Sequence, residues 1–465
     1  MAVDGRSPTR DTERIGPATG ADARSIATRV RSREITARRV VEDHLALIAE
    51  QNPRLNAIVT VAAAGAREEA DALDHRLDRG GPAGPLAGVP FTVKDLIATA
   101  GVRTTAASPA LAANVPVVDA PAVAAMRAAG AILIGKTNTP EFGTSGLTDN
   151  EMFGPTVNPL GSPDSPRSPG GSSGGEAASI ASGMSVLGLG TDFGGSVRWP
   201  AHCTGLCSIR PTVGRVSADG QYPGVLVGDH VWANPTTVHG TLQTVGPMAR
   251  TLGDLVLALR VISEPHIAWT DPATVDVDAL TITWAAGEGT VPVADEIVDV
   301  VRESARRLGA RPYRGSALAE GNDLFGRLRS TQTHTDIDAL GSVDRFGAVI
   351  RDLLSAAGRA GQREVEELWA QRTALVHRLL AEMGDVLVLP VASIGAPPLG
   401  LERFGVDDRL LTWQEALASC RTISVTGFPS VVVPVGRASD GMPIGVQIVA
   451  RPFHDHVALA VAARL

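Results

Sequence analysis

The residues best suited to chemistry in this sequence are serines inside glycine-rich loops. Residues 170–175 read GGSSGG, and a second loop at 191–200 reads TDFGGSVRWP and contains Ser196. Consecutive glycines allow a sharp turn, so that successive backbone N–H groups can point into one small space. Such a nest of amides suits the oxyanion that forms when a nucleophile attacks a carbonyl. The second loop therefore predicts Ser196 as a nucleophile, beside an oxyanion hole made by Phe193, Gly194 and Gly195.

A serine hydroxyl is a weak nucleophile at neutral pH and needs a base. None of the ten histidines lies in a recognisable triad context, whereas lysine occurs only at positions 94 and 136 among 42 Lys and Arg residues. Arginine cannot be deprotonated in a protein, but a buried lysine can become neutral and accept a proton. We therefore predict that Lys94 acts on Ser196 through Ser172 or Ser173, with a pKa lowered by burial without a carboxylate partner. Lys136 is predicted to be structural.

The elements around these residues alternate between strand and helix, which predicts an α/β fold. Residues 86–97 form a predicted strand that has Lys94 near its end and turns the side chain of Asp95 to the opposite side. A predicted helix at 176–182 and a strand at 186–190 separate the two glycine-rich loops. Further helices are predicted at 21–49, 62–77, 120–129, 252–261, 293–308 and 359–383, and further strands at 56–61, 131–134, 280–284, 386–390, 430–434 and 445–450.

Length and charge restrict the class of protein. The chain has 465 residues, a net charge of -8 and 44% hydrophobic residues, which is typical of a globular protein with a large core. No basic excess is available to neutralise phosphates, and no apolar run is long enough to cross a bilayer, so we expect no nucleic-acid or membrane partner. Residues 1–20 are predicted to be a flexible leader and 21–465 one domain. We expect a cytoplasmic protein with reduced thiols at its three cysteines.

The longest recognisable segment, GGSSGGEAASIASGMSVLGLGTDFGGSVRWPA at residues 170–201, resembles the signature of the amidase signature hydrolases. Supporting similarity extends over roughly residues 21–460 and includes GVPFTVKD (88–95), GKTNTPEFG (135–143), FGPTVNP (153–159), GPMARTLGDL (246–255) and GFPSVVVPVG with DGMPIGVQIVARPF (427–453). The resemblance implies one large domain with a large mixed β-sheet flanked by helices on both faces.

The resemblance also implies roles for individual residues. Ser196 would be the nucleophile, Ser172 a bridging serine that follows a cis peptide bond, and Lys94 the base, in hydrolysis of a small-molecule amide through an acyl-enzyme. Supporting roles fall on three further residues: Asp192 and Arg198 would brace the oxyanion loop, and Ser173 would help to position Lys94. No metal or cofactor is implied, and a homodimer is compatible with the family.

Three alternatives remain at this point. The segment GSSGG fits the nucleophile-elbow pattern GxSxG, with Ser173 as nucleophile, but no strand precedes it. The chain could instead be the glutamine-hydrolysing subunit of a tRNA-dependent amidotransferase, or a non-catalytic binding protein on the same fold. The acyl pocket is expected near residues 142–148, 222–232 and 330–410. Aromatic residues at Phe325, Trp369 and Phe404 favour an apolar or aryl acyl group.

Overall fold

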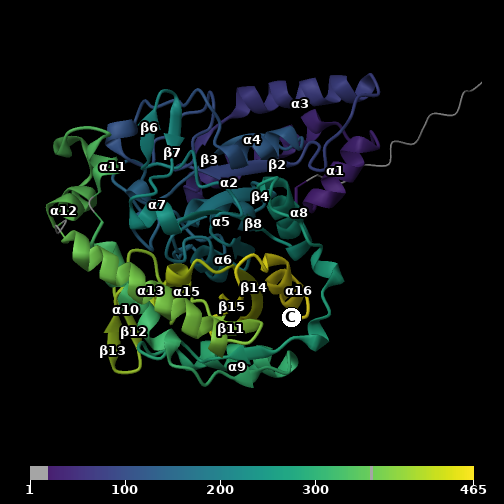
Figure 1. Ribbon diagram of the computed structural model, residues 1–465. Helices are drawn as coiled ribbons and strands as arrows, with labels where there is room; N and C mark the ends of the chain where they lie inside the picture. The colour runs from purple at the N-terminus through teal and green to yellow at the C-terminus, as the bar shows by residue number, and fades with distance from the viewer. Residues whose placement is uncertain (1–18, 333, 357–359) are drawn as a thin grey trace, which may run out of the picture.

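The computed structural model of the chain describes residues 19–332, 334–356 and 360–465. Its centre is a mixed sheet of eleven strands (Figure 1). In spatial order the strands are β1 (Ile58–Val61), β3 (Ile132–Thr137), β2 (Pro90–Lys94), β4 (Leu187–Asp192), β8 (Thr244–Ala249), β5 (Cys207–Arg210), β14 (Ser430–Arg437), β15 (Pro443–Ala450), β11 (Val386–Pro390), β9 (Ile282–Trp284) and β10 (Arg311–Pro312). Two small hairpins lie outside it: β6 (Val225–Val227) with β7 (His230–Trp232), and β12 (Phe404–Val406) with β13 (Arg409–Leu411).

The sheet combines parallel and antiparallel pairs. Strands β3, β2 and β4 run parallel to one another, as do β11, β9 and β10 at the other end. The strands between these two groups pair antiparallel. Parallel neighbours require crossover connections, which helices supply here. The mixed sheet expected from the sequence is therefore confirmed.

Helices surround the sheet. They are α1 (Ala23–Arg31), α2 (Ala37–Leu55), α3 (Ala63–Asp78), α4 (Pro121–Ala128), α5 (Gly174–Ala181), α6 (Arg198–Thr204), α7 (Val238–Leu242), α8 (Leu252–Ile262), α9 (Asp295–Arg307), α10 (Ala317–Ser330), α11 (Thr335–Asp338), α12 (Ala348–Ala356), α13 (Gln362–Glu382), α14 (Trp413–Ala416), α15 (Ala418–Thr426) and α16 (Asp455–Ala462). Within the described part of the chain, none of them is both long and apolar enough to span a membrane.

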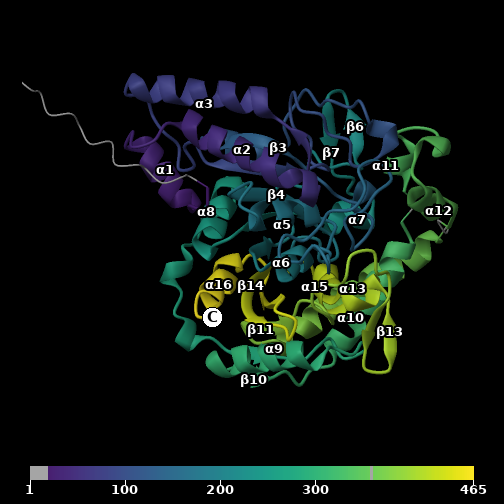
Figure 2. The same cartoon turned by 180° about the vertical axis from the view of Figure 1, so that it is seen from behind.

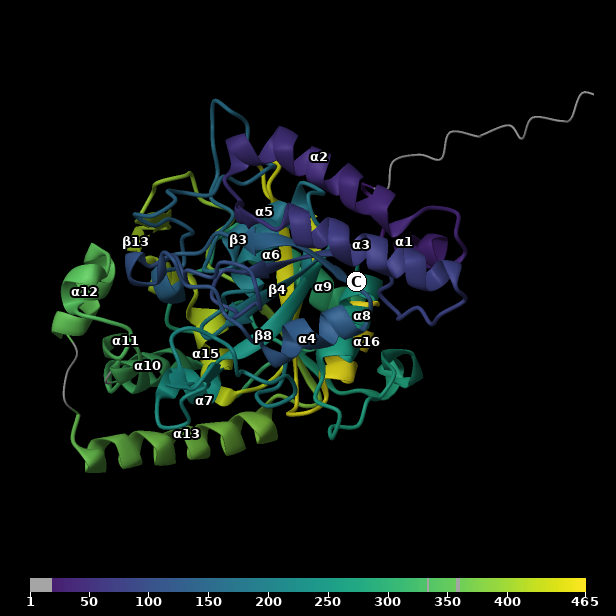
Figure 3. The ribbon, with the colours of Figure 1, turned by 90° about the horizontal axis from the view of Figure 1, so that it is seen from above.

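Alternation along β4 separates the two faces of the sheet. Leu187 and Leu189 belong to the main apolar core, which also includes residues of α8. Gly188, between them, faces the opposite way, because a Cβ there would meet the carboxyl of Glu176 in α5. Helix α5 therefore covers one face and α8 the other, as Figure 3 shows. This arrangement confirms a single α/β domain with helices on both faces.

A layer of C-terminal helices forms a further wall beside the sheet. Helices α10, α13 and α15 pack on one another (Figure 2). Their apolar residues, among them Phe325 and Ile423, form a cluster against which Phe193 of the second glycine-rich loop packs. The loop that carries Ser196 therefore lies between the sheet and this helical layer.

The pattern of apolar residues predicted many elements within a few residues of their observed bounds. The strand predicted at 186–190 is β4, and the helix predicted at 293–308 is α9. Helix α15 was missed because its sequence, ASCRTISVT, is rich in β-branched and polar residues and forms a helix that is buried almost all round. Residues 1–18 of the expected leader lie outside the described residues, so the boundary between leader and domain remains a prediction.

The close approach of α5 to β3 gives a test of the fold. A Cβ at Gly175 would overlap the backbone N of Asn138 and lie 2.5 Å from the backbone O of the same residue. We expect Gly175→Ala to lower the free energy of unfolding by about 1–3 kcal/mol, because backbone atoms cannot move aside as side chains can. Thermal or urea unfolding measures the change.

Gly65→Ala is the matched control, since nothing lies within 4 Å of a Cβ at that position in α3. It should stabilise the protein by up to about 1 kcal/mol through helix propensity. Equal stability of the two variants would contradict the packing described for α5.

Candidate active site

Lys94 is the last residue of β2 and is completely buried. Its Nζ donates hydrogen bonds to Ser172 Oγ at 2.6 Å and to Thr191 Oγ1 at 2.9 Å. Burial lowers the pKa of Lys94 to about 7, although the charges of Asp192 and Glu176 oppose the shift. Within the described residues no carboxylate forms an ion pair with it. A substantial fraction of Lys94 is therefore neutral near pH 7, as a base requires.

Ser172 and Ser173 connect the two glycine-rich loops. The Gly171–Ser172 peptide bond is cis. The backbone N–H of Ser173 donates to the carbonyl of Ser196 at 3.2 Å, which brings the two loops into contact. The Ser173 hydroxyl is buried and lies 3.3 Å from both the backbone N and the backbone O of Thr191. Lys94 and the Ser173 hydroxyl thus both bond to Thr191, a contact that was not expected from the sequence.

Asp192 organises the loop that carries Ser196. Its carboxylate accepts hydrogen bonds from the backbone N–H of Gly195 at 2.9 Å and of Val197 at 3.2 Å. It also accepts two hydrogen bonds from Arg198, each at 3.0 Å, and lies 3.5 Å from Arg210. Burial alone would raise the pKa of Asp192, but the two arginines and the Gly195 N–H hold it well below its usual range. These contacts join Asp192 and Arg198 to the loop that carries Ser196, and the bracing role expected for them stays a prediction.

The backbone amides of this loop differ in their availability. The N–H of Gly195 is occupied by Asp192 and does not point freely towards a substrate. The N–H groups of Phe193, Gly194 and Ser196 have no hydrogen-bond partner within the described part of the chain. The predicted set of Phe193, Gly194 and Gly195 therefore contains two free amides and one that the loop itself uses.

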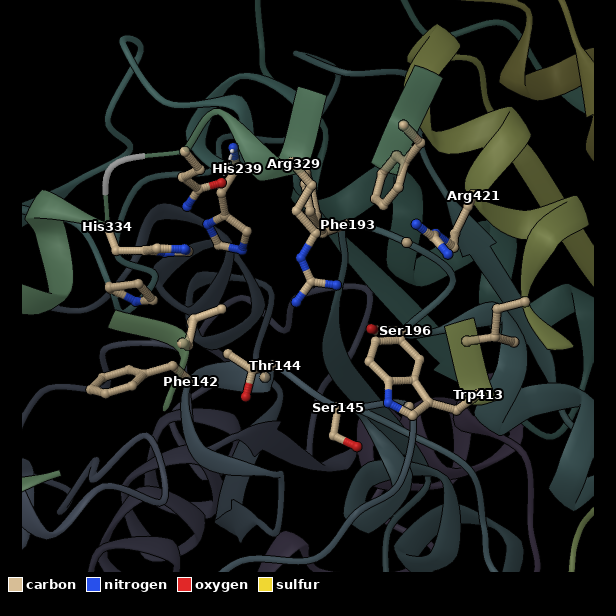
Figure 4. A pocket seen from close by; sticks show the side chains of 18 of the residues that line it. Phe142, Thr144, Ser145, Phe193, Ser196, His239, Arg329, His334, Trp413 and Arg421 are labelled. Carbon is tan, nitrogen blue, oxygen red and sulfur yellow. Dashed lines mark hydrogen bonds between the residues drawn. The ribbon is translucent and has the colours of Figure 1, made fainter. Parts of the chain in front are cut away.

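Ser196 is half-buried and lines a cavity between the sheet and the helical layer. Figure 4 shows its hydroxyl at the cavity wall, with Trp413 and Arg421 nearby. No hydrogen bond joins the hydroxyls of Ser196 and Ser172 among the described residues. The two serines are nevertheless held close, because the residue after Ser172 is bonded to the Ser196 carbonyl.

The cavity comes partly from the segments expected to form it. Phe142–Gly146 and Pro223 lie in those segments, and Phe325 lines it as expected. Trp369 and Phe404 do not line it. Trp369 packs against the cluster of α10 and α13, and Phe404 belongs to the core beside β12. Sequence reasoning missed five lining residues. Four of them come from four separate helices, namely His239, Arg329, Trp413 and Arg421, and the fifth is Leu417 between α14 and α15.

Comparison with known proteins agrees with this geometry. The chain matches the Amidase family over residues 39–289 and 348–459. It belongs to this amidase signature family.

Individual relatives cover nearly the whole chain. A glutamyl-tRNA(Gln) amidotransferase subunit of Roseiflexus sp. (strain RS-1) is 33% identical over 92% of each chain. Indoleacetamide hydrolase of Bradyrhizobium diazoefficiens is 32% identical over 97% of this chain and 87% of the relative. The structure of a bacterial aryl acylamidase of the amidase signature family has a TM-score of 0.80 and 27% identity, over 96% of each chain. The chain is therefore an amide-hydrolysing enzyme.

A second buried acid lies beneath the catalytic region of this amidase. Glu176 accepts hydrogen bonds from the hydroxyls of Thr92 and Thr137, the latter at 2.8 Å. Burial raises the pKa of Glu176 to about 7, with these hydrogen bonds and the two lysines opposing the shift. The hydroxyls bind the carboxyl group in place of water, so Glu176 does not need an ion pair with Lys94.

Lys136, the other lysine of this amidase, is buried away from Ser196. Its Nζ donates to the carbonyl of Ile97 and to the hydroxyls of Thr99 and Thr104, the latter two at 2.9 Å each. All three protons of its ammonium group are thereby used, which fits the structural role predicted for it. Asp95 bonds to Thr105 and not to Lys94, in agreement with its predicted side of the strand.

The Asp192–Arg198 pair provides a test of the loop architecture. Arg198→Met removes the guanidinium that joins Asp192 to the C-terminal helices, and leaves Asp192 with the more distant Arg210. Breaking a buried pair by removing one partner should cost about 3–5 kcal/mol of stability. Chemical denaturation measures the change, and activity should fall with it.

Arg363→Met is the matched control, because that side chain is 92% exposed in a surface pair with Glu367. Its effect should stay within about 0.5 kcal/mol. A stability loss for Arg198→Met that is no larger than this control would show that the buried pair does not hold the loop.

Proposed function

We propose that this enzyme hydrolyses small-molecule carboxylic acid amides with Ser196 as nucleophile, Ser172 as bridge and Lys94 as base. The observation that carries the proposal is the contact between a buried lysine without an ion pair and the Ser172 hydroxyl at 2.6 Å. The pKa of about 7 supports it, because the best base has a pKa near the working pH. The contact of Ser173 with Ser196 keeps the third group within reach.

In the proposed first step, neutral Lys94 takes a proton from Ser172, which takes one from Ser196 as Ser196 attacks the amide carbonyl. The free N–H groups of Phe193, Gly194 and Ser196 stabilise the resulting oxyanion, and Gly195 supports the loop through Asp192. The relay then returns a proton to the leaving nitrogen, so that ammonia or an amine departs and an acyl-enzyme remains. Water hydrolyses the acyl-enzyme by the same route in reverse.

A second candidate is glutamine hydrolysis within a multi-subunit complex. The observation that favours it is the 33% identity to an amidotransferase subunit over almost the full length. Co-purification of a partner chain, together with ammonia release from glutamine, would favour this function. Hydrolysis of simple amides by the isolated chain, with no activity on glutamine, would favour the stand-alone enzyme.

The nucleophile is tested by Ser196→Ala. We expect hydrolysis of a reactive aryl amide to fall to background while the unfolding temperature stays within a few degrees, since a half-buried hydroxyl is removed without leaving a charged group unpaired. A fluorophosphonate label should modify wild-type Ser196, detected by mass spectrometry of the digested protein. Labelling of the Ser196→Ala variant to the same extent would place the nucleophile elsewhere.

The base is tested by Lys94→Arg, which keeps a positive charge and removes basicity. We expect kcat/KM to fall by about 10²- to 10⁴-fold, the usual contribution of a general base. In the wild type, kcat/KM should rise with pH through about 7, because only neutral Lys94 can accept a proton and lower pH protonates it.

Lys136→Arg is the control for this substitution. Both variants enlarge a buried cation, so a loss of stability is common to the two. Folded Lys136→Arg should keep the rise of kcat/KM near pH 7. Near-normal activity of Lys94→Arg would rule out Lys94 as the base.

A further inference from the structure

Two arginines extend into the cavity that contains Ser196. Arg329 comes from α10 and Arg421 from α15, so they reach the cavity from different helices. Figure 4 shows the guanidinium of Arg329 near the centre of the cavity, between His239 and Ser196, and that of Arg421 on the wall above Ser196. Positive charge is thus concentrated beside the proposed nucleophile.

Neither guanidinium has the partner that a half-buried arginine usually finds. Among the described residues, the side chain of Arg329 forms no hydrogen bond and no ion pair. Arg421 donates one hydrogen bond, to the carbonyl of Gln414 at 3.1 Å, and its buried Nε has no partner. Each guanidinium has five N–H donors, so most of these donors are available.

Little negative charge lies near the two arginines, and Glu415, which acts on Arg421, does not line the cavity. Among the described residues that line this cavity there is no Asp or Glu. Burial lowers the pKa of His239 to about 3, so its imidazole is neutral, and burial lowers the pKa of His334 as well. Burial and the charge of Arg329 lower the pKa of Arg421 to about 10, against the opposing charge of Glu415. Both arginines are charged at neutral pH and repel each other.

Each of these guanidinium groups stacks its flat face on an aromatic ring, which leaves most N–H donors on its edge free. The Cζ of Arg329 lies 5.9 Å from the centre of the Trp413 ring, and that of Arg421 lies 5.0 Å from the centre of the Phe325 ring. Stacking of this kind orients the planar groups. Most N–H donors on the edges therefore stay available to the cavity, and such an edge can bind a carboxylate through two parallel hydrogen bonds.

We propose that the substrates of this enzyme are amides that carry a carboxylate, and that Arg329 and Arg421 bind this carboxylate while the amide faces Ser196. The inference rests on the proposed function and extends it to a substrate class. A second, cationic group on the substrate would find no acidic side chain in the described lining. The site therefore fits a net anionic amide, such as the half-amide of a dicarboxylic acid, better than a zwitterion such as glutamine.

A matched series of amides tests this inference. Pentanamide, glutaramate and L-glutamine share a five-carbon chain. Glutaramate has a carboxylate in place of the terminal methyl group of pentanamide, and glutamine carries an additional ammonium group beside that carboxylate. We expect kcat/KM for glutaramate to exceed that for the other two by at least about 10-fold, the range of a charge-assisted hydrogen bond. N-acetylglycine, whose carboxylate lies on the amine side, shows on which side of the scissile bond the arginines bind.

Arg329→Gln and Arg421→Gln provide the second arm. Each should lower the ratio of kcat/KM for the anionic amide to that for pentanamide by about 10- to 100-fold, mainly through KM. Arg327→Gln is the matched control, because Arg327 lies on the same helix with its side chain 51% exposed in a pair with Asp323. This variant should keep the wild-type ratio. Unfolding temperatures identify any variant that fails to fold.

The outcomes separate the two proposals. A wild-type preference for pentanamide, or a ratio unchanged in both Arg329→Gln and Arg421→Gln, would overturn the carboxylate site while Ser196→Ala still abolished turnover. Hydrolysis that survives Ser196→Ala would overturn the proposed function instead. Binding supplies an independent readout: glutarate should raise the unfolding temperature of Ser196→Ala, and Arg329→Gln in that background should remove this shift. Absence of any shift with glutarate in Ser196→Ala counts against the carboxylate site.

Discussion

An amine removed from water without a carboxylate beside it loses much of its affinity for a proton, and the proposed active site is built around a lysine in this situation. The side chain of Lys94 is fully buried, and its hydrogen-bond partners among the described residues are two hydroxyls. Hydroxyls satisfy its hydrogen bonds in either protonation state, whereas a carboxylate would hold the proton in place. The low pKa of Lys94 thus follows from which groups the fold places around it and which it keeps away.

The two buried acids near Lys94, Asp192 and Glu176, are stabilised in different ways. Asp192 lies near Lys94 but is neutralised by Arg198 and Arg210, so that its charge raises the Lys94 pKa less than burial lowers it. Glu176 is surrounded by threonine hydroxyls and has its pKa raised to about 7. One acid is compensated by arginine and the other is held by neutral donors. In both cases the buried polar groups are satisfied without forming an ion pair with the base.

The residues proposed for catalysis and the two arginines proposed to bind the substrate carboxylate come from different parts of the chain. The residues proposed for catalysis lie on strand β2 and in the two glycine-rich loops. The contact between Ser173 and Ser196 joins these two loops. Arg329 and Arg421 belong to helices α10 and α15, which bring both side chains into the cavity that Ser196 lines. Glycines permit the close approach of α5 to the sheet, as the positions of Gly175 and Gly188 show.

Patterns local to the chain were enough to identify the elements with a clear period, the two serine loops and the isolated lysine. A strand alternates every two residues, and a glycine-rich loop is visible wherever it occurs. Such patterns did not indicate which N–H groups remain free, because the bond from Gly195 to Asp192 depends on how the loop closes. These patterns also could not single out Arg329 and Arg421. Only two of the 42 Lys and Arg residues are lysines, so arginine is common throughout the sequence. What distinguishes these two arginines is that no acidic side chain lines the described cavity around them. Groups separated by some 90 residues in the chain meet only when packing brings helices α10 and α15 together.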